Sequence, residues 1–216
     1  MSDSPSATRR GEGIVVYGAG GHAKVVCDVL LCAGHAVLGF VDDEPKTHGT
    51  MVLGLPVFGP GAWLEREQHA VALGIGDNSV RRAVLAACEA RGLRVVSAVH
   101  PSSCIARSAR VGTGTVVMAF AAINPDARIG RAAIINTAAV VEHDGVVGDF
   151  AHLSPSSAMG GAARLGEGAH LGIGAMILPG VSVGDESIIG GGAVVARDVP
   201  PRVVAYGVPA RVARAR

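Results

Sequence analysis

The sequence predicts a chain of class α/β + β, in which a small Rossmann-like parallel α/β domain precedes a parallel β-helix of hexapeptide repeats. Short aliphatic segments alternate with helical patterns over residues 13–100, and an aliphatic residue then recurs at every sixth position. Glycine is abundant, with 31 of 216 residues, and aromatic residues make up only 3%. This composition favours thin, regular layers built from small and aliphatic side chains.

The α/β domain is expected at residues 13–100. Its strands are expected at 13–17, 36–41, 70–75 and 93–99, and its helices at 22–33 and from about 78 to 91. Gly34 and Gly92 follow the helical patterns as stop signals, and Asp77 or Asn78 is suited to cap the second helix. Strands that alternate with helices imply a parallel sheet.

The β-helix is predicted from an unbroken period of six residues. Sixteen aliphatic residues follow one another at this spacing from Ile105 to Val195, and a small residue or valine stands four positions after each. Each hexad supplies a short strand and a turn, and three hexads make one triangular coil of 18 residues. We place the β-helix at 101–200, a C-terminal tail at 201–216 and a disordered lead-in at 1–12.

Charge, hydropathy and cysteine usage exclude several classes of protein. The 19 basic and 18 acidic residues give no basic excess of the kind that nucleic-acid-binding proteins show. No apolar run approaches the length of a membrane span, and the polar N-terminus has no signal-peptide core. The four cysteines form no CxxC pair and are expected to be reduced, which fits a cytoplasmic protein.

Several segments carry a family resemblance. They are YGAGGHAKVV at 17–26, FVDDE at 40–44, GIGDN at 74–78, AVHPS at 98–102, INTAAVVEHDGVVGDFAHLSP at 135–155, GIGAMILPGVSVG at 172–184 and GVPAR at 207–211. Together they resemble the bacterial nucleotide-aminosugar N-acetyltransferases and sialic acid O-acetyltransferases. The run VVMAFAAINPDARIG at 116–130 is particularly similar to perosamine N-acetyltransferases, whereas the pair Asp42-Asp43 is more similar to bacillosamine N-acetyltransferases, which use a UDP-sugar. These two cues disagree about the nucleotide.

The resemblance implies an architecture and a set of ligands. It implies a left-handed course of the β-helix, which the repeat alone does not determine, and a homotrimer with active sites between neighbouring prisms. It also implies acetyl-CoA as cosubstrate and a nucleotide-linked amino sugar as acceptor, with no metal. His152 and His170 are one coil apart and stack on one edge, but no carboxylate or cysteine completes a metal site. His170 is interpreted as a surface residue.

His143 is the candidate catalytic base. It follows Val-Glu in a coil made otherwise of small and aliphatic residues, and a neutral imidazole can accept a proton near pH 7. From the residues alone, a solvated surface histidine is equally plausible. Asp144 and Glu142 compete to orient the ring, and the resemblance favours Asp144 because the family places an acid directly after the histidine. We expect direct transfer without an acyl-enzyme.

The candidate acetyl-CoA residues follow His143 along the β-helix. Gly161 comes three hexads later and is expected one coil further on the same face, where its N–H can donate to the acetyl oxygen. A glycine needed for a tight corner is the alternative. The resemblance places His152 beside acetyl-CoA, while Ile173, Gly174 and Gly191 are expected to offer backbone amides to the pantetheine arm. Arg211 is expected to reach a phosphate, with Arg214 and Arg216 as a solvated tail.

The candidate nucleotide site lies at the first strand-to-helix turn. The segment from Gly18 to Ala23 follows a strand and opens a helix, so that Gly20 and Gly21 can bring backbone N–H groups to a phosphate. The pattern alone is a weak signal, but a domain this short suits one nucleotide. The resemblance places His22 and Lys24 near the diphosphate and sugar, Asp42 and Asp43 near the ribose and base, and Asn136 near the sugar. Asn78, with Arg81 or Arg82, is a weaker candidate.

Three functions are compatible with these features. The favoured one is N-acetylation of the 4-amino group of a UDP- or GDP-linked 4-amino-4,6-dideoxy sugar. The alternatives are O-acetylation of a sugar of the sialic acid type and a non-enzymatic β-helix that binds a nucleotide sugar. The phosphate loop favours the first function over the second, and the His-Asp pair disfavours the third.

Overall fold

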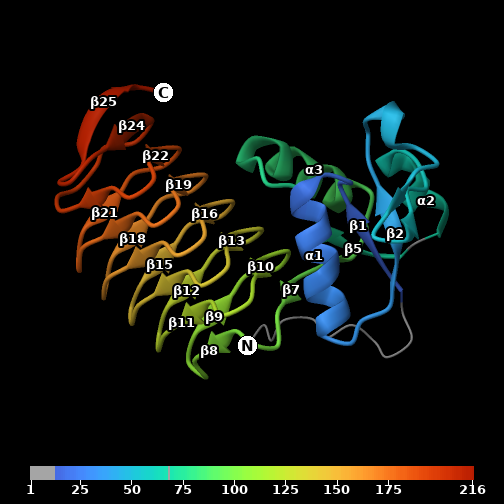
Figure 1. Ribbon diagram of the computed structural model, residues 1–216, viewed down its shortest axis with the longest axis horizontal. Coiled ribbons are helices and arrows are strands. Elements are labelled where there is room, and N and C mark those ends of the chain that lie inside the picture. The colour runs from blue at the N-terminus through green and yellow to red at the C-terminus, as the bar shows by residue number, and fades with distance from the viewer. Residues whose placement is uncertain (1–12, 68) are drawn as a thin grey trace.

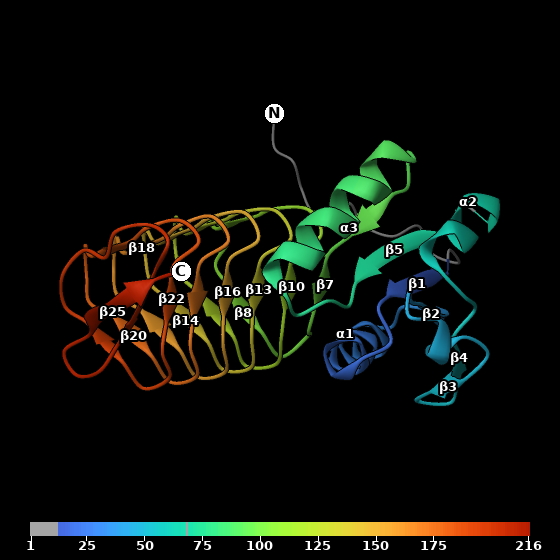
Figure 2. The same cartoon turned by 90° about the horizontal axis from the view of Figure 1, so that it is seen from above.

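The structure, a computed structural model, describes residues 13–67 and 69–216 and consists of two parts (Figure 1). An α/β domain leads into a parallel β-helix, called the prism below, that ends in a short extension of one of its sheets (Figures 1 and 2). This arrangement confirms the predicted class. The expected lead-in at 1–12 lies outside the described residues.

The α/β domain is built on a four-stranded parallel sheet. Its order is β2 (Val37–Val41), β1 (Ile14–Tyr17), β5 (Ala70–Leu73) and β6 (Val95–Val96). Helix α1 (Gly21–Cys32) packs with one set of β1 side chains and helix α3 (Asn78–Ala90) with the alternate set. Because both faces of β1 and β5 are covered, these strands are aliphatic throughout, apart from Tyr17 at the end of β1. The remaining elements are η1 (Pro45–Thr47), β3 (Met51–Val52), β4 (Leu55–Pro56), η2 (Gly61–Trp63) and α2 (Leu64–Glu67).

Two helix starts are important for the site. α1 begins at Gly21, directly after β1 and a short glycine-rich turn, and its N-cap residue, Gly20, has no side chain to cap the first N–H groups. α3 begins at Asn78 and is capped by Asp77, whose Oδ1 accepts from the backbone N–H groups of Ser79 and Val80 at 2.9 Å each. Asp77 rather than Asn78 is therefore the cap, so the Asn78 side chain is available for another contact.

The prism contains the sixteen predicted hexads as sixteen two-residue strands. Their second residues are the aliphatic residues of the six-residue period, which fill the prism interior. The strands are β8 (Cys104–Ile105), β9 (Arg110–Val111), β10 (Val116–Val117), β11 (Ala122–Ile123), β12 (Arg128–Ile129), β13 (Ile134–Ile135), β14 (Val140–Val141), β15 (Val146–Val147), β16 (His152–Leu153), β17 (Ala158–Met159), β18 (Arg164–Leu165), β19 (His170–Leu171), β20 (Met176–Ile177), β21 (Ser182–Val183), β22 (Ile188–Ile189) and β23 (Val194–Val195).

The strands form three sheets, which are the faces of the prism. Face I contains β7 (Ala98–Val99), β10, β13, β16, β19 and β22, followed by β24 (Val203–Tyr206) and β25 (Arg211–Ala215). Face II contains β8, β11, β14, β17, β20 and β23, and face III contains β9, β12, β15, β18 and β21. Parallel pairing joins each strand to the strand three hexads later, as between Val116 and Ile134. A residue and its counterpart one coil later therefore lie on the same face.

The three corners of the prism are tight turns with left-handed backbone. The I/II corner includes Phe120, Ala138, Ser156 and Gly174, and the II/III corner includes Asp126, Asp144, Ala162 and Gly180. The III/I corner includes Ala132, Phe150, Gly168 and Glu186. All have positive φ, and successive members of one corner are separated by one full coil. The fold thus assigns each turn residue to one of three edges.

Two segments differ from expectation. The predicted strand at 93–99 is divided: β6 belongs to the α/β sheet, whereas β7 pairs with β10 and begins face I before Pro101. Residues 201–216, expected to be a tail, form β24, which continues face I, and β25, which pairs antiparallel with β24. Val99 of β7 stands six residues before Ile105 and packs on the prism interior, so the period begins one hexad earlier than predicted. Residues 201–216 lack the period and instead find backbone partners at the open end of the prism.

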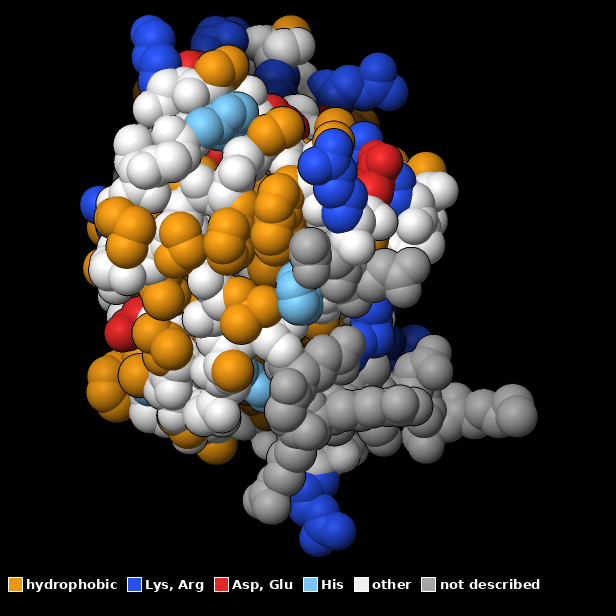
Figure 3. Space-filling model, turned by 90° about the vertical axis from the view of Figure 1, so that its right-hand side faces the viewer, with side chains coloured by type: hydrophobic (Ala, Val, Ile, Leu, Met, Phe, Trp, Pro, Cys, Tyr) orange, Lys and Arg blue, Asp and Glu red, His pale blue; other side chains and the backbone are white. Residues whose placement is uncertain are grey.

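The outer surface adds three observations. No helix in the described part of the chain has the length and apolar character to cross a membrane. Cys27, Cys32, Cys88 and Cys104 are all free, with Cys32 and Cys104 exposed. Figure 3 views the end of the molecule formed by the α/β domain, where apolar side chains gather in the middle of the face and basic side chains stand above them.

Candidate active site

A pocket lies where the carboxyl ends of β1, β2 and β5 meet the start of α1. Its volume is about 380 Å³. It is lined by the predicted residues Gly20, Gly21, His22, Asp42 and Asp43, together with Tyr17, Gly18, Gly74, Ile75, Gly76, Val80 and Val84. The carboxyl edge of a parallel sheet beside a helix N-terminus is where such folds bind phosphate-bearing ligands.

Glycine is required at the first turn of this pocket. Gly18 has a φ of +105°, and a Cβ there would approach the carbonyl oxygen of Gly74 to 2.8 Å. Gly20 and Gly21 differ, because a Cβ on either would meet no atom within 4 Å. The space over Gly20 and Gly21 is therefore open toward the pocket, at the positively polarised end of α1.

Internal hydrogen bonds orient the two carboxylates of the pocket. Asp42 accepts from the backbone N–H groups of Ala19 and Glu44 at 2.6 and 2.9 Å. Asp43 accepts from the Tyr17 hydroxyl at 2.8 Å and from the Gly61 N–H at 2.9 Å. These contacts tie the turn after β2 to the turn after β1. Burial, with Asp43 second, raises the pKa of Tyr17, so its hydroxyl stays a donor.

Three predicted substrate residues, Lys24, Asn78 and Asn136, lie outside this pocket. Lys24 is exposed on α1 and does not line it. Asn78 turns toward the prism, where its Nδ2 donates to the carbonyl oxygen of Gly168 at 3.0 Å and its Oδ1 accepts from Arg81 at 2.8 Å. Arg81 is itself fully buried. Because the helix starts at Asn78, its phase directs both side chains to the prism surface.

A row of histidines joins the pocket to face I. The ring of His22, which lines the pocket, lies 6.4 Å from the ring of His152, and His152 stacks on His170 at 4.6 Å. The Thr137 N–H donates to Oδ1 of Asn136, which leaves the amide NH₂ to donate to Nε2 of His152 at 3.1 Å. An imidazole that accepts at Nε2 is neutral, with its proton on Nδ1.

Burial keeps this histidine row uncharged. Desolvation, with the nearby Arg81 charge second, lowers the pKa of His22 to about 4. Desolvation, followed by His170, lowers the pKa of His152 to about 3. The Nε2 atom of His22 is buried and has no hydrogen-bond partner among residues 13–67 and 69–216. His170 is thus part of a packed cluster, with Nε2 2.7 Å from the Ser154 hydroxyl, rather than an isolated surface residue.

His143 and Asp144 form a second constellation at the II/III corner. Nδ1 of His143 lies 2.9 Å from Oδ2 of Asp144, whereas the Glu142 carboxylate accepts from the His143 backbone N–H at 3.3 Å. A carboxylate can only accept, so Nδ1 carries a proton, and in the neutral ring Nε2 then has a free lone pair. The hydrogen bond to Asp144 is the main cause that raises the pKa of His143. The pair is exposed to solvent.

Gly161 lies one coil beyond His143, as its spacing predicts. A Cβ on Gly161 would come within 2.5 Å of Nε2 and 2.6 Å of Cε1 of the His143 ring. The N–H of Ala162 donates to the His143 carbonyl at 2.8 Å, which holds the two coils together. The imidazole therefore rests on bare backbone, and glycine at this position is needed for the ring rather than for the turn.

The predicted acetyl-CoA residues occupy two different corners of the chain. Gly161 belongs to the II/III corner with His143, whereas Ile173, Gly174 and Gly191 belong to the I/II corner. Ile173 is 64% exposed, with its side chain on the surface. The remaining two are His152 on face I and Arg211, exposed at the start of β25. Within one chain, the residues at the II/III corner and those at the I/II corner are therefore not brought together.

No metal-binding arrangement is found in the part of the chain that the structure describes. There, no three histidine, cysteine or carboxylate side chains are grouped as ligands. The stacked pair His152 and His170 faces Asn136 and Ser154 rather than an acid.

Two family models match the chain. Residues 13–87 match the PglD N-terminal domain, and residues 162–197 match the bacterial transferase hexapeptide (six repeats). These are most of the α/β domain and the later coils of the prism.

Solved structures extend the match to nearly the whole chain. The perosamine N-acetyltransferase of Caulobacter crescentus, solved with CoA and GDP-perosamine, is 44% identical over 96% of this chain and 100% of its own, with a TM-score of 0.89. The chain belongs to the family of bacterial nucleotide-aminosugar N-acetyltransferases. Another family member, the acetyltransferase domain of PglB from Neisseria gonorrhoeae solved with acetyl coenzyme A, is 33% identical over 94% of this chain and 99% of its own, with a TM-score of 0.88.

This N-acetyltransferase also has polar residues that the sequence analysis did not single out for their roles. Tyr17 reads as the last residue of a buried strand, but its hydroxyl contacts Asp43 in the pocket wall. Arg81 is a candidate for the nucleotide site from sequence, yet its guanidinium donates to backbone carbonyls of the prism. The helical phase of α3, which depends on Asp77 being the cap, is the signal that identifies the inward side of that helix.

Proposed function

We propose that this N-acetyltransferase transfers the acetyl group of acetyl-CoA to the 4-amino group of a nucleotide-linked 4-amino-4,6-dideoxy sugar. His143 is the general base, and Asp144 orients its ring. The observation that carries this proposal is the His143–Asp144 pair resting on the backbone of Gly161, which gives a neutral imidazole a free Nε2 on an exposed corner. Direct transfer requires no more than this base and a donor for the oxyanion.

The chemical step follows from these groups. The free amine attacks the thioester carbonyl, the new N–C bond forms, and Nε2 of His143 takes the proton that the amine loses. The carbonyl oxygen becomes an oxyanion, for which the N–H of Gly161 is the proposed donor. When the C–S bond breaks, the imidazolium returns its proton to the sulfur of CoA. Asp144 stabilises the imidazolium in between.

The pocket of the α/β domain is proposed to hold the nucleotide diphosphate. Support comes from the open space over Gly20 and Gly21 at the start of α1 and from the oriented carboxylates of Asp42 and Asp43. Nε2 of His22 has no hydrogen-bond partner in the described part of the chain, and His22, which lines the pocket, is proposed to contact the diphosphate or sugar. We favour GDP over UDP as the nucleotide to test first, because the enzyme solved with GDP-perosamine is 44% identical over 96% of this chain.

A homotrimer is proposed because face II needs a partner. Its outward positions are Cys104, Ala122, Val140, Ala158, Met176 and Val194, so no charged side chain points from its strands, and Met176 is 49% exposed. The outward positions of face III include Arg110, Arg128 and Arg164. An apolar face beside a basic one is suited to burial against other copies of the chain.

Threefold symmetry also completes the site. If face II of each protomer turns toward the threefold axis, the II/III corner of one prism lies next to the I/II corner of its neighbour. His143 and Gly161 of one protomer then face the Ile173 and Gly174 corner, the His152 face and the nucleotide pocket of the next. Asn136, paired to His152, is proposed to border the sugar there. Acetyl-CoA is proposed to lie in this groove, and Arg211 is proposed to contact one of its phosphates.

A direct assay tests the proposal. The full-length protein is mixed with acetyl-CoA and GDP- or UDP-linked 4-amino-4,6-dideoxy sugar, and free thiol and N-acetylated product are measured together. His143→Ala should lower kcat by roughly 10²-fold or more if the histidine is the base. A His143→Ala enzyme with near-normal kcat would remove the histidine from the mechanism. Turnover with sialic acid but with neither nucleotide sugar would instead favour the O-acetyltransferase alternative.

A further inference from the structure

Arg81 connects the nucleotide pocket to the prism through one buried guanidinium. On the pocket side, Nη1 donates to the carbonyl oxygens of Ile75 and Gly76 at 3.0 Å each, and both residues line the pocket. The side chain is 0% exposed. One end of the fork therefore holds the turn that follows β5.

On the prism side, the same guanidinium binds two coils. Nε donates to the carbonyl oxygen of Ala132 at 2.7 Å, and Nη2 donates to that of Phe150 at 2.8 Å. Ala132 and Phe150 are equivalent turn residues of successive coils at the III/I corner, where left-handed backbone leaves their carbonyls outside the coil's own ladder. Nη2 also donates to Oδ1 of Asn78. The fork thus has five hydrogen bonds in two directions.

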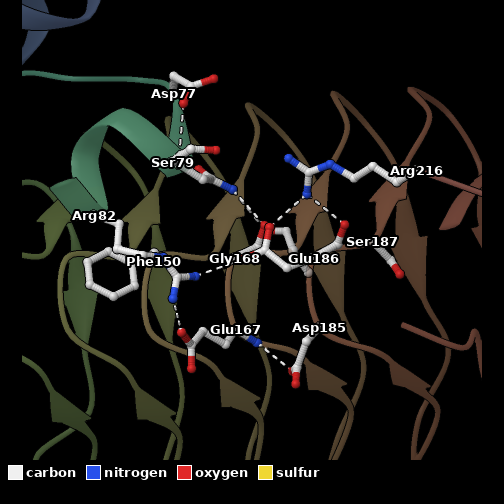
Figure 4. A network of polar contacts seen from close by, with 12 residues as sticks. Asp77, Ser79, Arg82, Phe150, Glu167, Gly168, Asp185, Glu186, Ser187 and Arg216 are labelled. Carbon is white, nitrogen blue, oxygen red and sulfur yellow. Dashed lines mark hydrogen bonds and ion pairs between the residues drawn. The ribbon is translucent and has the colours of Figure 1, made fainter. Parts of the chain in front are cut away.

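This contact extends along the corner. Asn78 donates to the Gly168 carbonyl, and Arg82 pairs with Glu167 and Glu186 while its guanidinium lies 4.7 Å from the Phe150 ring centroid (Figure 4). Figure 2 shows the start of α3 beside the prism near β10, with the rest of the helix running away from it. Arg82 and Glu186 are partly exposed, so their ion pairs contribute little. Arg81 is the buried member of the set.

An adjacent side of α3 borders the pocket. Val80 and Val84 line it, together with Ile75 and Gly76 that Arg81 holds. α3 is therefore a wall shared by the pocket and the prism corner. A buried cation without a carboxylate partner is costly, and only the planar fork of arginine can serve both sets of carbonyls at once. Burial lowers the pKa of Arg81 to about 10, which leaves it charged at neutral pH.

We propose that Arg81 is a positioning residue: it fixes the nucleotide pocket against the prism and so sets where the amino group of a bound nucleotide sugar reaches the neighbouring His143. The effect on the position of the amino group rests on the proposed function, whereas the effect of Arg81 on nucleotide binding in the pocket does not. Because acyl transfer is sensitive to displacements of about 1 Å, a loosened α3 should affect the sugar and the chemical step and leave acetyl-CoA binding intact.

The test compares Arg81→Lys with Arg131→Lys. Arg131 also connects α3 to the III/I corner, through an exposed ion pair with Glu89 at 2.9 Å, but it touches no pocket residue. Both variants keep the charge and lose the planar fork. Kinetic constants are referred to the number of acetyl-CoA-binding sites, so that misfolded protein does not count.

The expected result for Arg81→Lys is a rise of about 10-fold in KM for the nucleotide sugar and a similar fall in kcat, with KM for acetyl-CoA within about twofold of wild type. Arg131→Lys should stay close to wild type in all three. A merely structural role would lower the melting temperature of Arg81→Lys but leave KM and kcat per binding site unchanged, and that result would overturn the proposal.

Two further measurements keep the proposal decidable. If Arg81→Lys does not fold, Asn78→Ala removes one contact of the same fork, and a smaller rise in KM for the sugar in the same direction is expected; an unchanged KM would reject the proposal. If wild type does not acetylate the sugar, the proposed function fails, and calorimetry with GDP and UDP decides the inference. Arg81→Lys must then bind that nucleotide about 10-fold more weakly than wild type does. Equal affinity of the two proteins, or no nucleotide binding by wild type, overturns the inference.

Discussion

The His143 ring lies against the backbone of Gly161, so closely that a Cβ on Gly161 would stand 2.5 Å from Nε2. Gly161→Ala should therefore displace the imidazole, and we expect kcat to fall by roughly 10²-fold, since a base acts only within hydrogen-bond reach of its proton. The measurement is kcat at saturating substrates. In a His143→Ala background the same substitution should add nothing, and an additive loss would mean that Gly161 acts independently of the ring.

The pH profile should report the contact between His143 and Asp144. The hydrogen bond to Asp144 raises the pKa of His143, so the neutral base accumulates only above that raised value. In Asp144→Asn the pKa should fall, moving the acid limb of kcat/KM to lower pH while the plateau drops by roughly 10-fold. Asparagine is the suitable replacement because residue 144 has a φ of +57°.

Glu142→Gln is the matched control for that profile. Glu142 accepts from the backbone N–H of His143 rather than from its ring. The acid limb of kcat/KM in Glu142→Gln should therefore lie close to that of wild type. If Glu142→Gln moves the limb more than Asp144→Asn does, the assignment of Asp144 as the orienting carboxylate is wrong.

Mixed trimers should show whether a site takes its base and its pocket from different protomers. Gly20→Asp adds a charge where the phosphate is expected without a steric clash, because a Cβ there meets nothing within 4 Å. Each of Gly20→Asp and His143→Ala should be nearly inactive alone. If they exchange subunits at equal amounts, about a quarter of the sites would pair an intact His143 with an intact pocket.

Activity of the mixture, after denaturation and refolding together, measures this outcome. Recovery of about a quarter of wild-type activity is expected for a site shared between neighbours. A mixture that stays inactive although mass analysis finds mixed trimers would place both parts of the site in one chain. A monomer in sedimentation would contradict the proposed trimer directly.

Acid should destabilise the fold through its histidine row. Burial lowers the pKa of His22 to about 4 and that of His152 to about 3. Below about pH 6.5 the unfolded chain therefore binds more protons than the folded chain does. The stabilising contribution is complete above about pH 6.5 and is lost as the pH falls toward 4. We expect a loss of roughly 2 kcal/mol per histidine between pH 7 and 4.5. In denaturant unfolding at one protomer concentration, the free energy of unfolding of His152→Asn should depend less steeply on pH than that of wild type.

The sequence was sufficient to predict the prism and insufficient for its ends. A six-residue period is set by local backbone geometry, and the grouping of three hexads into one coil places His143 and Gly161 in register from their spacing alone. Val99 of β7 does keep the period, but it lies within a run that also reads as the last strand of the α/β domain. The strands at 203–215 carry no such period, because their place depends on an unpaired edge at the end of the prism. Arg81 shares the inward side of α3 with Val84, Leu85 and Cys88, so its helical phase indicates burial, but the sequence does not reveal which carbonyls it contacts.

The stacking of equivalent turns, one in every coil, limits how such a chain can change in length. Loss of one hexad would preserve the aliphatic interior yet rotate everything beyond it by a third of a turn, which would move Ile173 and Gly174 from the I/II corner to another edge. Loss of a whole coil would return each residue to its own edge, one step nearer His143. Natural relatives should therefore differ inside the prism by whole coils, with the reach of the pantetheine arm fixing how many coils separate the base from the CoA phosphates.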